Sequence, residues 1–352
     1  MHSDAFVGRR HDVERVLVCP MAGLFPVAAR TAGGDIVVVF RTGAPHYGLS
    51  GTLATCSSSD GGRTWSDPRE LAPRGGDVRN PALGVAPDGR WLVAYWRAGV
   101  RAYVGGAWRL PAPVAGDDDL FVVASSDRGA TWSEPRAVRS ALHPWASPFG
   151  RIVALADGAL AMAVYGPEVG GEATAFSASI VRSRDGGATW GEPARVLAGA
   201  SELSLCVLPD ARVVGAVRRL RGDVAIVTSG DHGATWSEPV VATRTDEHPA
   251  DLTVLRGSGA LLLTFGRRRR PLGCGALVSR DAGVTWDRDR EVLLAGDGVG
   301  NDVGYPSTVQ LDDGTVVTVA YFAKGSAGGE PPHHWGDTTC QAIRYGEQLV
   351  TG

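Results

Sequence analysis

The chain has 352 residues, with 35 Lys and Arg against 38 Asp and Glu, and a net charge of −3. This balance gives no reason to expect a nucleic acid or a membrane surface as partner. The many Gly and Pro residues, 48 and 21, are typical of a turn-rich all-β protein, and no helical periodicity extends over ten or more residues.

The N-terminal segment lacks an apolar core like that of a signal peptide, and no apolar run approaches the 18 residues that span a membrane. We therefore expect a cytoplasmic protein. Five widely spaced cysteines without a CxxC pair indicate neither a disulfide framework nor a zinc site, so we expect no metal and no cofactor. They are Cys19, Cys56, Cys206, Cys274 and Cys340.

The pattern Ser-x-Asp-x-Gly-x-Thr-Trp occurs five times. Its carboxylates are Asp60, Asp127, Asp185, Asp231 and Asp281. The Asp and Gly stand where a tight turn needs a side-chain acceptor and a positive φ, so each Asp is expected to accept backbone N–H bonds and close the turn. We expect the Thr-Trp pair to begin a strand and bury its indole. Because a catalytic residue is needed only once, we interpret these repeated Asp residues as structural.

A second repeat, a turn followed by a short apolar strand, occurs six times. Its copies start at Gly33, Asp88, Asp157, Asp210, Gly257 and Asp313. We therefore predict an all-β fold with one domain, residues 1–352, forming a six-bladed β-propeller. The last blade should be completed by strands from both chain ends, including Arg15 to Val18.

In a propeller the residues that flank the inner strands converge at one rim. The polar segments before these strands contain Arg79, Ser147, Glu202, His248, Asp251 and Tyr305, and the strand ends carry Arg41, Arg97, Tyr165, Arg218, Arg267 and Tyr321. Four arginines at equivalent positions predict an acidic ligand, because guanidinium groups bind carboxylates bidentately. The run from Arg267 to Arg270 is either part of this anion site or a solvated loop.

The five repeats are identified as Asp-boxes, and the whole chain resembles the sialidase (neuraminidase) superfamily. This resemblance implies a tyrosine nucleophile activated by a Glu, an Asp acid/base and three arginines that bind the substrate carboxylate. The segment from Ser201 is similar to the family's Glu-strand-Arg segment, which assigns Glu202 and Arg218. The segment from Gly304 is similar to the nucleophile segment, which assigns Tyr305.

The third arginine is implied at Arg267 or Arg270, before the last Asp-box. Two positions depart from the family pattern: Leu24 stands where the first arginine is expected, and His46 stands where the acid/base Asp is expected, near the matching Arg41. Arg79 could supply the missing guanidinium from a neighbouring unit. A histidine titrates near neutral pH, so His46 could serve as the general acid or base.

Each of these residues also has a structural interpretation. His46 could be an exposed loop residue, Tyr305 a packing residue and Glu202 a turn residue. His248 and Asp251 could be substrate contacts or supports of the site. The loop containing His333 and His334 could be a lid or simply solvated.

Three functions remain open. The first is hydrolysis of a terminal acidic sugar, such as sialic acid, through Tyr305, Glu202 and His46. The second is β-elimination or hydrolysis of a uronic-acid glycan with His46 as acid/base, since an arginine-bound carboxylate stabilises the enolate. The third is binding of an acidic glycan or metabolite without catalysis. In each case the expected partner is a small molecule or glycan that carries a carboxylate.

Overall fold

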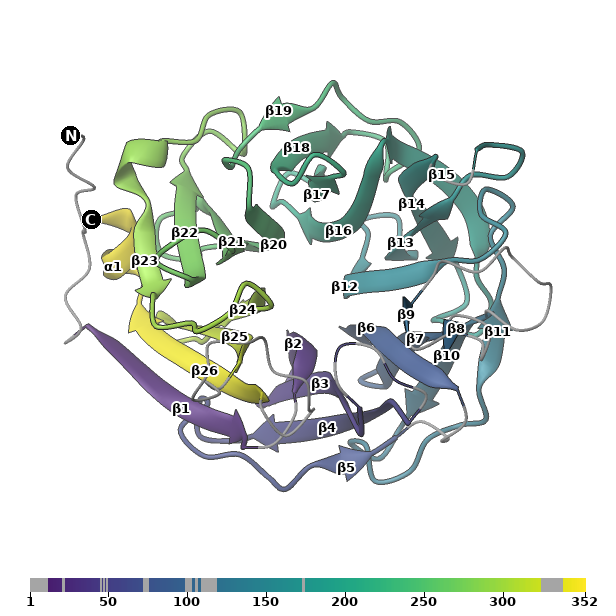
Figure 1. Ribbon diagram of the computed structural model, residues 1–352, viewed down its shortest axis with the longest axis horizontal. Helices are drawn as coiled ribbons and strands as arrows, with labels where there is room; N and C mark the ends of the chain where they lie inside the picture. Colours follow the sequence, from purple (N-terminus) through teal and green to yellow (C-terminus); the bar gives the residue numbers. More distant parts are fainter. Residues whose placement is uncertain are drawn as a thin grey trace.

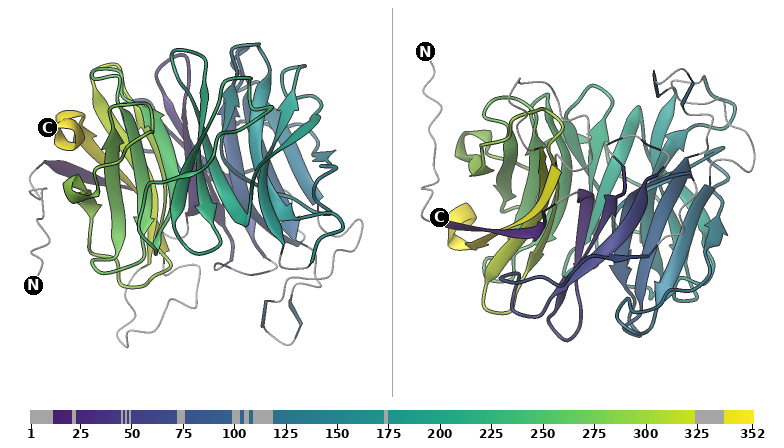
Figure 2. Two further views of the ribbon diagram at one scale, coloured as in Figure 1. Left: turned by 90° about the horizontal axis from the view of Figure 1, so that it is seen from above. Right: turned by 60° about the horizontal axis from the view of Figure 1, so that its bottom comes forward.

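The computed structural model describes residues 12–20, 23–44, 46, 48, 50–71, 76–98, 103–104, 107–108, 119–172, 175–323 and 338–352. They form an all-β, propeller-like fold in which small sheets surround a common centre (Figure 1). Seen edge-on, the strands run across the thickness of a disc-like molecule (Figure 2). A short 3-10 turn at Arg288–Arg290 and the helix α1 at Gln348–Thr351 are small additions to the sheets.

Four of the sheets have four strands each. One contains β2 (Leu24–Arg30), β3 (Ile36–Thr42), β4 (Thr52–Ser58) and β5 (Arg69–Glu70). Another contains β16 (Ala200–Val207), β17 (Val213–Arg219), β18 (Val224–Ser229) and β19 (Val240–Val241). The third contains β20 (Glu247–Val254), β21 (Leu261–Arg267), β22 (Gly273–Ser279) and β23 (Val292–Ala295).

The fourth of these sheets contains the first and the last strands of the chain. Its order is β24 (Gly304–Gln310), β25 (Thr315–Ala323), β26 (Thr338–Gly346) and β1 (Val13–Cys19). β1 lies antiparallel to β26, with Arg15 opposite Ile343 and Val16 opposite Ala342. The prediction that both chain ends complete the last sheet is confirmed.

An eight-stranded sheet fills the rest of the ring. One half has the order β11 (Arg136–Val138), β10 (Asp119–Ser125), β7 (Trp91–Ala98) and β6 (Asp77–Val85). The other half has β12 (Ser147–Ala154), β13 (Leu160–Pro167), β14 (Phe176–Ser183) and β15 (Gly191–Ala198). Each half is antiparallel, and the halves meet through a short parallel pairing of β6 with β12. A small hairpin pairs β8 (Tyr103–Val104) with β9 (Ala107–Trp108).

The core lies between neighbouring sheets. The side chains of β3 are buried along almost its whole length, which is why its sequence, IVVVFRT, is apolar without alternation. Val38 and Phe40 pack in one cluster with Val317 and Val319 of β25, so the first and last sheets share a core. A strand that packs on both faces needs apolar residues at successive positions, and this accounts for the second repeat seen in the sequence.

The Asp-box carboxylates close their turns as predicted. Asp231 accepts bonds from the Thr235 backbone N–H at 2.9 Å, the Thr235 hydroxyl at 2.6 Å and the Ser229 hydroxyl at 2.7 Å. Thr235 and Ser229 thereby lower the pKa of Asp231 to about 2. Stability from this carboxylate is therefore fully present above its unfolded pKa, near 4, and is lost as the pH falls toward 2.

The part of the prediction that concerned the Thr-Trp pair needs correction. The Trp residues are half-buried rather than buried. In the first copy β5 begins only at Arg69, four residues after Trp65, whereas in the third copy β15 begins directly after Trp190. The indole Nε1 of Trp236 donates to the Gly233 carbonyl at 3.1 Å, so this Trp completes the turn before the strand starts.

We expect Asp231→Ala to lower Tm, with a loss of about 1–2 kcal/mol, because the turn loses its acceptor for three donors. Thermal unfolding followed by circular dichroism measures this change. Asp67→Ala removes an exposed carboxylate just beyond the first Asp-box and should leave Tm unchanged. Equal Tm values for both variants would contradict the structural role.

Candidate functional site

The inner strands carry a β-bulge near their first residues. In β2, β6, β16, β20 and β24 the register skips two residues relative to the neighbouring strand. The skipped pairs are Phe25-Pro26, Asn80-Pro81, Ser201-Glu202, His248-Pro249 and Tyr305-Pro306. Four of the pairs end in Pro, which has no N–H to donate to a ladder.

The bulges redirect side chains toward one end of the ring. Phe25, Asn80 and Tyr305 have φ values of 54°, 50° and 50°, in the left-handed region that non-glycine residues rarely adopt. Such strain is concentrated at functional sites, where the surrounding fold imposes it. Asn80, Glu202 and Tyr305 from three different strands thereby reach one pocket.

The pocket has a volume of about 400 Å³. Its charged and polar lining residues come from several sheets, and an aromatic wall faces them. The lining residues are His46, Arg79, Asn80, Trp96, Trp145, Tyr165, Phe176, Ser201, Glu202, Arg218, Leu220, Arg268 and Tyr305.

Glu202 is the centre of the hydrogen bonding in this pocket. The Tyr305 hydroxyl donates to Glu202 Oε1 at 2.8 Å, and Arg218 donates to both carboxylate oxygens at 3.0 and 3.1 Å. The Ser201 hydroxyl donates to Oε2 at 2.7 Å. The predicted proximity of Tyr305 and Glu202, 103 residues apart, is therefore present in the fold.

The electrostatics of this group favour an ionised Glu202. Burial opposes the charged form, but Arg218 and the hydrogen bonds from Ser201 and Tyr305 outweigh it and lower the pKa of Glu202 to about 2. Burial and the negative Glu202 raise the pKa of Tyr305 well above 10, while Arg218 and Arg268 act in the opposite direction. The phenol is thus protonated in the resting site, with a carboxylate in position to take its proton.

His46 forms a second polar group with Asp302 and Tyr321. Its Nδ1 lies 3.0 Å from Asp302 Oδ2, and the Tyr321 hydroxyl donates to the other oxygen of Asp302. Burial lowers the pKa of His46 despite the opposing effect of Asp302. Burial also opposes ionisation of Asp302, but His46 and Tyr321 lower its pKa to about 2. With Asp302 ionised, Nδ1 carries the proton and Nε2 is left as a base.

Sequence reasoning missed Asp302. It stands three residues before Tyr305, beside the start of the same inner strand. An acid so close to a candidate nucleophile was the available signal. Phe25 lies between the two polar groups, with its ring centroid 4.9 Å from that of His46 and 4.8 Å from that of Tyr305.

Three guanidinium groups line the pocket, from Arg79, Arg218 and Arg268. Arg268 donates from Nε to the His248 carbonyl at 3.1 Å, and its Cζ lies 5.6 Å from the centroid of the Tyr305 ring. Its buried NH2 group has no hydrogen-bond partner among the residues that the structure describes. A buried donor without a partner favours an anionic ligand at this position. Arg79 lines the pocket, with its Cζ 5.7 Å from the centroid of the Phe25 ring.

Arg268, rather than Arg267 or Arg270, faces the pocket. Arg267 is buried and donates from Nε to Glu291 Oε1 at 2.9 Å, and from NH1 to the Pro271 carbonyl at 2.7 Å. Arg270 is exposed and is not among the lining residues. Which arginine of the run faces the pocket depends on the conformation of the loop after β21, and residue spacing does not determine that conformation.

The predicted ring of four strand-end arginines is also wrong, since only Arg218 reaches the pocket. The Arg41 side chain is fully buried, pairs with Asp77 and donates to the Gly48 carbonyl at 3.1 Å. Arg97 lies over the ring of Phe121, 4.6 Å from Cζ to the centroid. The neighbouring sheet or strand holds these guanidinium groups away from the common end of the ring.

His248 and Asp251 lie outside the pocket lining. Asp251 is buried, accepts from the Ser204 hydroxyl at 2.6 Å and the Thr308 backbone N–H at 2.7 Å, and pairs with Arg151 at 3.1 Å. It therefore ties the inner strands β12, β16 and β24 to β20. His248 supports Arg268 through its carbonyl, and burial lowers its pKa to about 3. The loop with His333 and His334 lies outside the described residues.

The aromatic wall of the pocket was not anticipated from the sequence. Trp96 and Trp145 stack with centroids 4.7 Å apart and planes 7° apart, and Phe176 meets Trp145 edge-on. Leu24, at the first-arginine position of the resemblance, is buried in a cluster with Phe25, Phe149, Tyr305 and Tyr321. That cluster is apolar where an arginine was expected.

Comparisons with known proteins agree with this fold. Residues 113–318 match the family described as BNR repeat-like domain. No curated protein matches the chain. No helix among the described residues is long and apolar enough to cross a membrane.

The structure is similar to that of a Dyadobacter fermentans protein of unknown function, with TM-score 0.77, 23% identity and coverage of 95% of this chain and 98% of that one. It is also similar to the Hadza microbial sialidase Hz136 (TM-score 0.71, 22% identity, 94% and 66% covered) and to Trypanosoma rangeli sialidase (0.68, 16%, 94% and 55%). The chain spans less than two thirds of either sialidase. These likenesses support a shared fold.

We expect Asp302→Asn to lower the pKa of His46 further, because Asp302 is the group that raises it. Titration of the imidazole by NMR measures the shift. His143, whose ring nitrogens contact the Pro167 carbonyl and the Ser179 hydroxyl, provides an internal control that should not move. An unchanged His46 titration would show that the two side chains are not coupled in solution.

Proposed function

Because the chain belongs to the BNR repeat-like domain family, with the fold of the sialidase structures, we propose that it is a sialidase-like exo-glycosidase that hydrolyses a terminal carboxylated sugar. The observation that carries this proposal is the 2.8 Å hydrogen bond from the Tyr305 hydroxyl to Glu202 in a pocket lined by three arginines. Tyrosine is a known nucleophile of sialidases among glycosidases.

In the proposed first step the Tyr305 oxygen attacks the anomeric carbon while Glu202 accepts the phenolic proton. Protonated His46 donates its proton to the leaving oxygen, so the glycosidic bond breaks as the tyrosyl bond forms. In the second step neutral His46 removes a proton from water, which attacks the same carbon, and Glu202 returns its proton to Tyr305. The configuration at the anomeric carbon is retained after two displacements.

The substrate carboxylate would lie against Arg79, Arg218 and Arg268. Arg268 NH2 supports this assignment, because it is buried and has no partner among the described residues. Arg218 also faces Glu202, so its charge is partly neutralised at rest. The arginines would bind the carboxylate and, once Glu202 is protonated, stabilise the negative charge that develops on Tyr305.

We also infer that the ring is one domain of six blades. The eight-stranded sheet would count as two blades, because its halves are each antiparallel and meet at only two pairs, Gly150 with Ala82 and Arg151 with Leu83. The inner strands of the blades would then be β2, β6, β12, β16, β20 and β24. An experimental structure in which these two halves formed one continuous blade would overturn the count.

We expect Tyr305→Phe to reduce kcat by at least about 10³-fold on an aryl glycoside of sialic acid, because the nucleophile is lost. Tyr345→Phe, a matched change at a buried tyrosine bonded to Thr318, should retain activity. Trapping of the tyrosyl intermediate with a fluorinated sugar, followed by mass spectrometry, gives an independent readout. Full turnover by Tyr305→Phe contradicts the mechanism, and binding without turnover by the unmodified protein favours a binding protein.

A second candidate, β-elimination from a uronic acid, is favoured by the His46–Asp302 pair. Burial lowers the pKa of His46, so at a given pH a larger fraction of its imidazole is neutral than in a free histidine. Nε2 would remove the proton α to an arginine-bound carboxylate, and the electron pair would expel the leaving oxygen after protonation by Tyr305. The product would carry a new carbon–carbon double bond.

The pH dependence separates the two chemistries. Hydrolysis with His46 as acid should be lost as the pH rises through the lowered pKa of His46, whereas elimination with His46 as base should be lost as the pH falls through it. We expect sialoside hydrolysis to decrease as the pH rises, with no product that absorbs in the near ultraviolet. An unsaturated product from a uronic-acid glycan, together with the opposite limb, would select elimination.

A further inference from the structure

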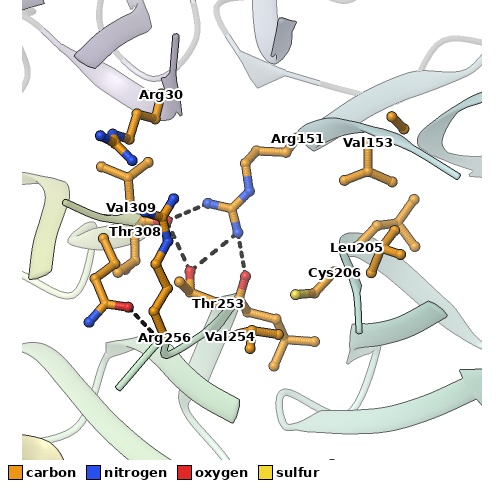
Figure 3. Close-up of a pocket in the computed structure, with 14 residues that line it drawn as sticks. Arg30, Arg151, Val153, Leu205, Cys206, Thr253, Val254, Arg256, Thr308 and Val309 are labelled. Carbon is orange, nitrogen blue, oxygen red and sulfur yellow. Dashed lines mark hydrogen bonds between the residues drawn. The ribbon is translucent and has the colours of Figure 1, made fainter. Parts of the chain in front are cut away.

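A second pocket, of about 360 Å³, lies at the opposite ends of the inner strands (Figure 3). It is lined by the last residues of β2, β12, β16, β20 and β24, whereas the catalytic candidates lie at the first residues of such strands. The nearest lining residues of the two pockets on β16, Glu202 and Leu205, are roughly 10 Å apart along the strand, and the pockets share no lining residue. No step of the proposed function uses this far pocket.

Among the residues that the structure describes, three arginines and no acidic side chain line the far pocket. Arg151 donates to the backbone carbonyls of Leu252 and Thr308 (dashed lines in Figure 3), so its guanidinium ties three inner strands together. The side chains of the other two arginines, Arg30 and Arg256, instead donate to a carboxylate.

Arg30 and Arg256 hold one carboxylate between them. Arg30 binds Asp312 in a fork, with NH1 donating to Oδ1 at 2.8 Å and NH2 donating to Oδ2, while Arg256 NH1 also donates to Oδ1. Asp312 lies in the turn between β24 and β25, and its side chain is 74% exposed. The two guanidinium groups are therefore already arranged as a clamp for a carboxylate, and its present occupant is on an exposed turn.

Beside the arginines, the lining contains the aliphatic residues Val153, Val207, Val254 and Val309 together with the polar residues Thr253, Thr308 and Gln310. Asp312 itself is not among the lining residues, so its carboxylate occupies the two arginines without covering the aliphatic part of the pocket. We propose that the far pocket binds a small carboxylate with an apolar body, whose head displaces Asp312 from Arg30 and Arg256.

Isothermal titration with hexanoate tests this proposal on the full chain. We expect weak binding to the unmodified protein and at least about tenfold tighter binding to Asp312→Asn, because an attached competitor has a high effective concentration. The control Asp313→Asn removes the neighbouring carboxylate, which caps the Thr315 backbone N–H at 2.9 Å, and should leave the affinity unchanged. Neutral hexanamide should not bind.

Arg30→Gln and Arg256→Gln should each abolish the rise in Tm that hexanoate causes, and this readout does not depend on Asp312→Asn being folded. Equal hexanoate affinity with and without Asp312, or retained binding in the arginine variants, overturns the proposal. Inorganic phosphate binding as tightly as hexanoate would overturn the apolar part of the ligand assignment. Because catalysis is not measured, failure of the glycosidase proposal would leave these outcomes unaffected.

Discussion

The pairing of β1 with β26 is the interaction on which the arrangement depends, because it joins the two ends of the chain in one sheet. Without it the last sheet would expose the edge of β26, and the ring would be held only by packing. Closure fixes the positions of all the sheets around the centre. Glu202 and Tyr305, which are 103 residues apart in the sequence, then lie within hydrogen-bond distance. The local sequence around each residue does not fix this distance.

Within this ring, β-bulges bring polar side chains to one end of the inner strands. A regular strand would alternate these side chains between the two faces of its sheet, where neighbouring sheets pack. Skipping two residues frees a side chain from that alternation and directs it toward the common centre. The positive φ of Tyr305 is the local cost of that placement, and the packed sheets around it maintain the conformation.

The charged groups in the pocket set one another's protonation states. Glu202 is kept ionised by Arg218, and it in turn keeps the proton on Tyr305 until a reaction draws it away. His46 is set in a separate group by Asp302, with Phe25 between them and the tyrosine. The two polar groups therefore reach the same pocket from different sides of the Phe25 ring.

The sequence alone determined the class of fold, because the Asp-box and the apolar strand repeat are local patterns whose turn chemistry and burial do not depend on distant residues. It also indicated Glu202, Tyr305 and Arg218, whose segments are similar to those of the family, and His46, which stands after Arg41 where the family pattern has an Asp. Only the tertiary structure decided which arginines face the pocket. Arg268 lines it in place of Arg267, and Arg41 is buried in an ion pair with Asp77. The partnership of His46 with Asp302, 256 residues away, likewise exists only after the ring closes. Side-chain direction in bulges and loops depends on neighbouring sheets, and residue spacing along one chain does not contain that information.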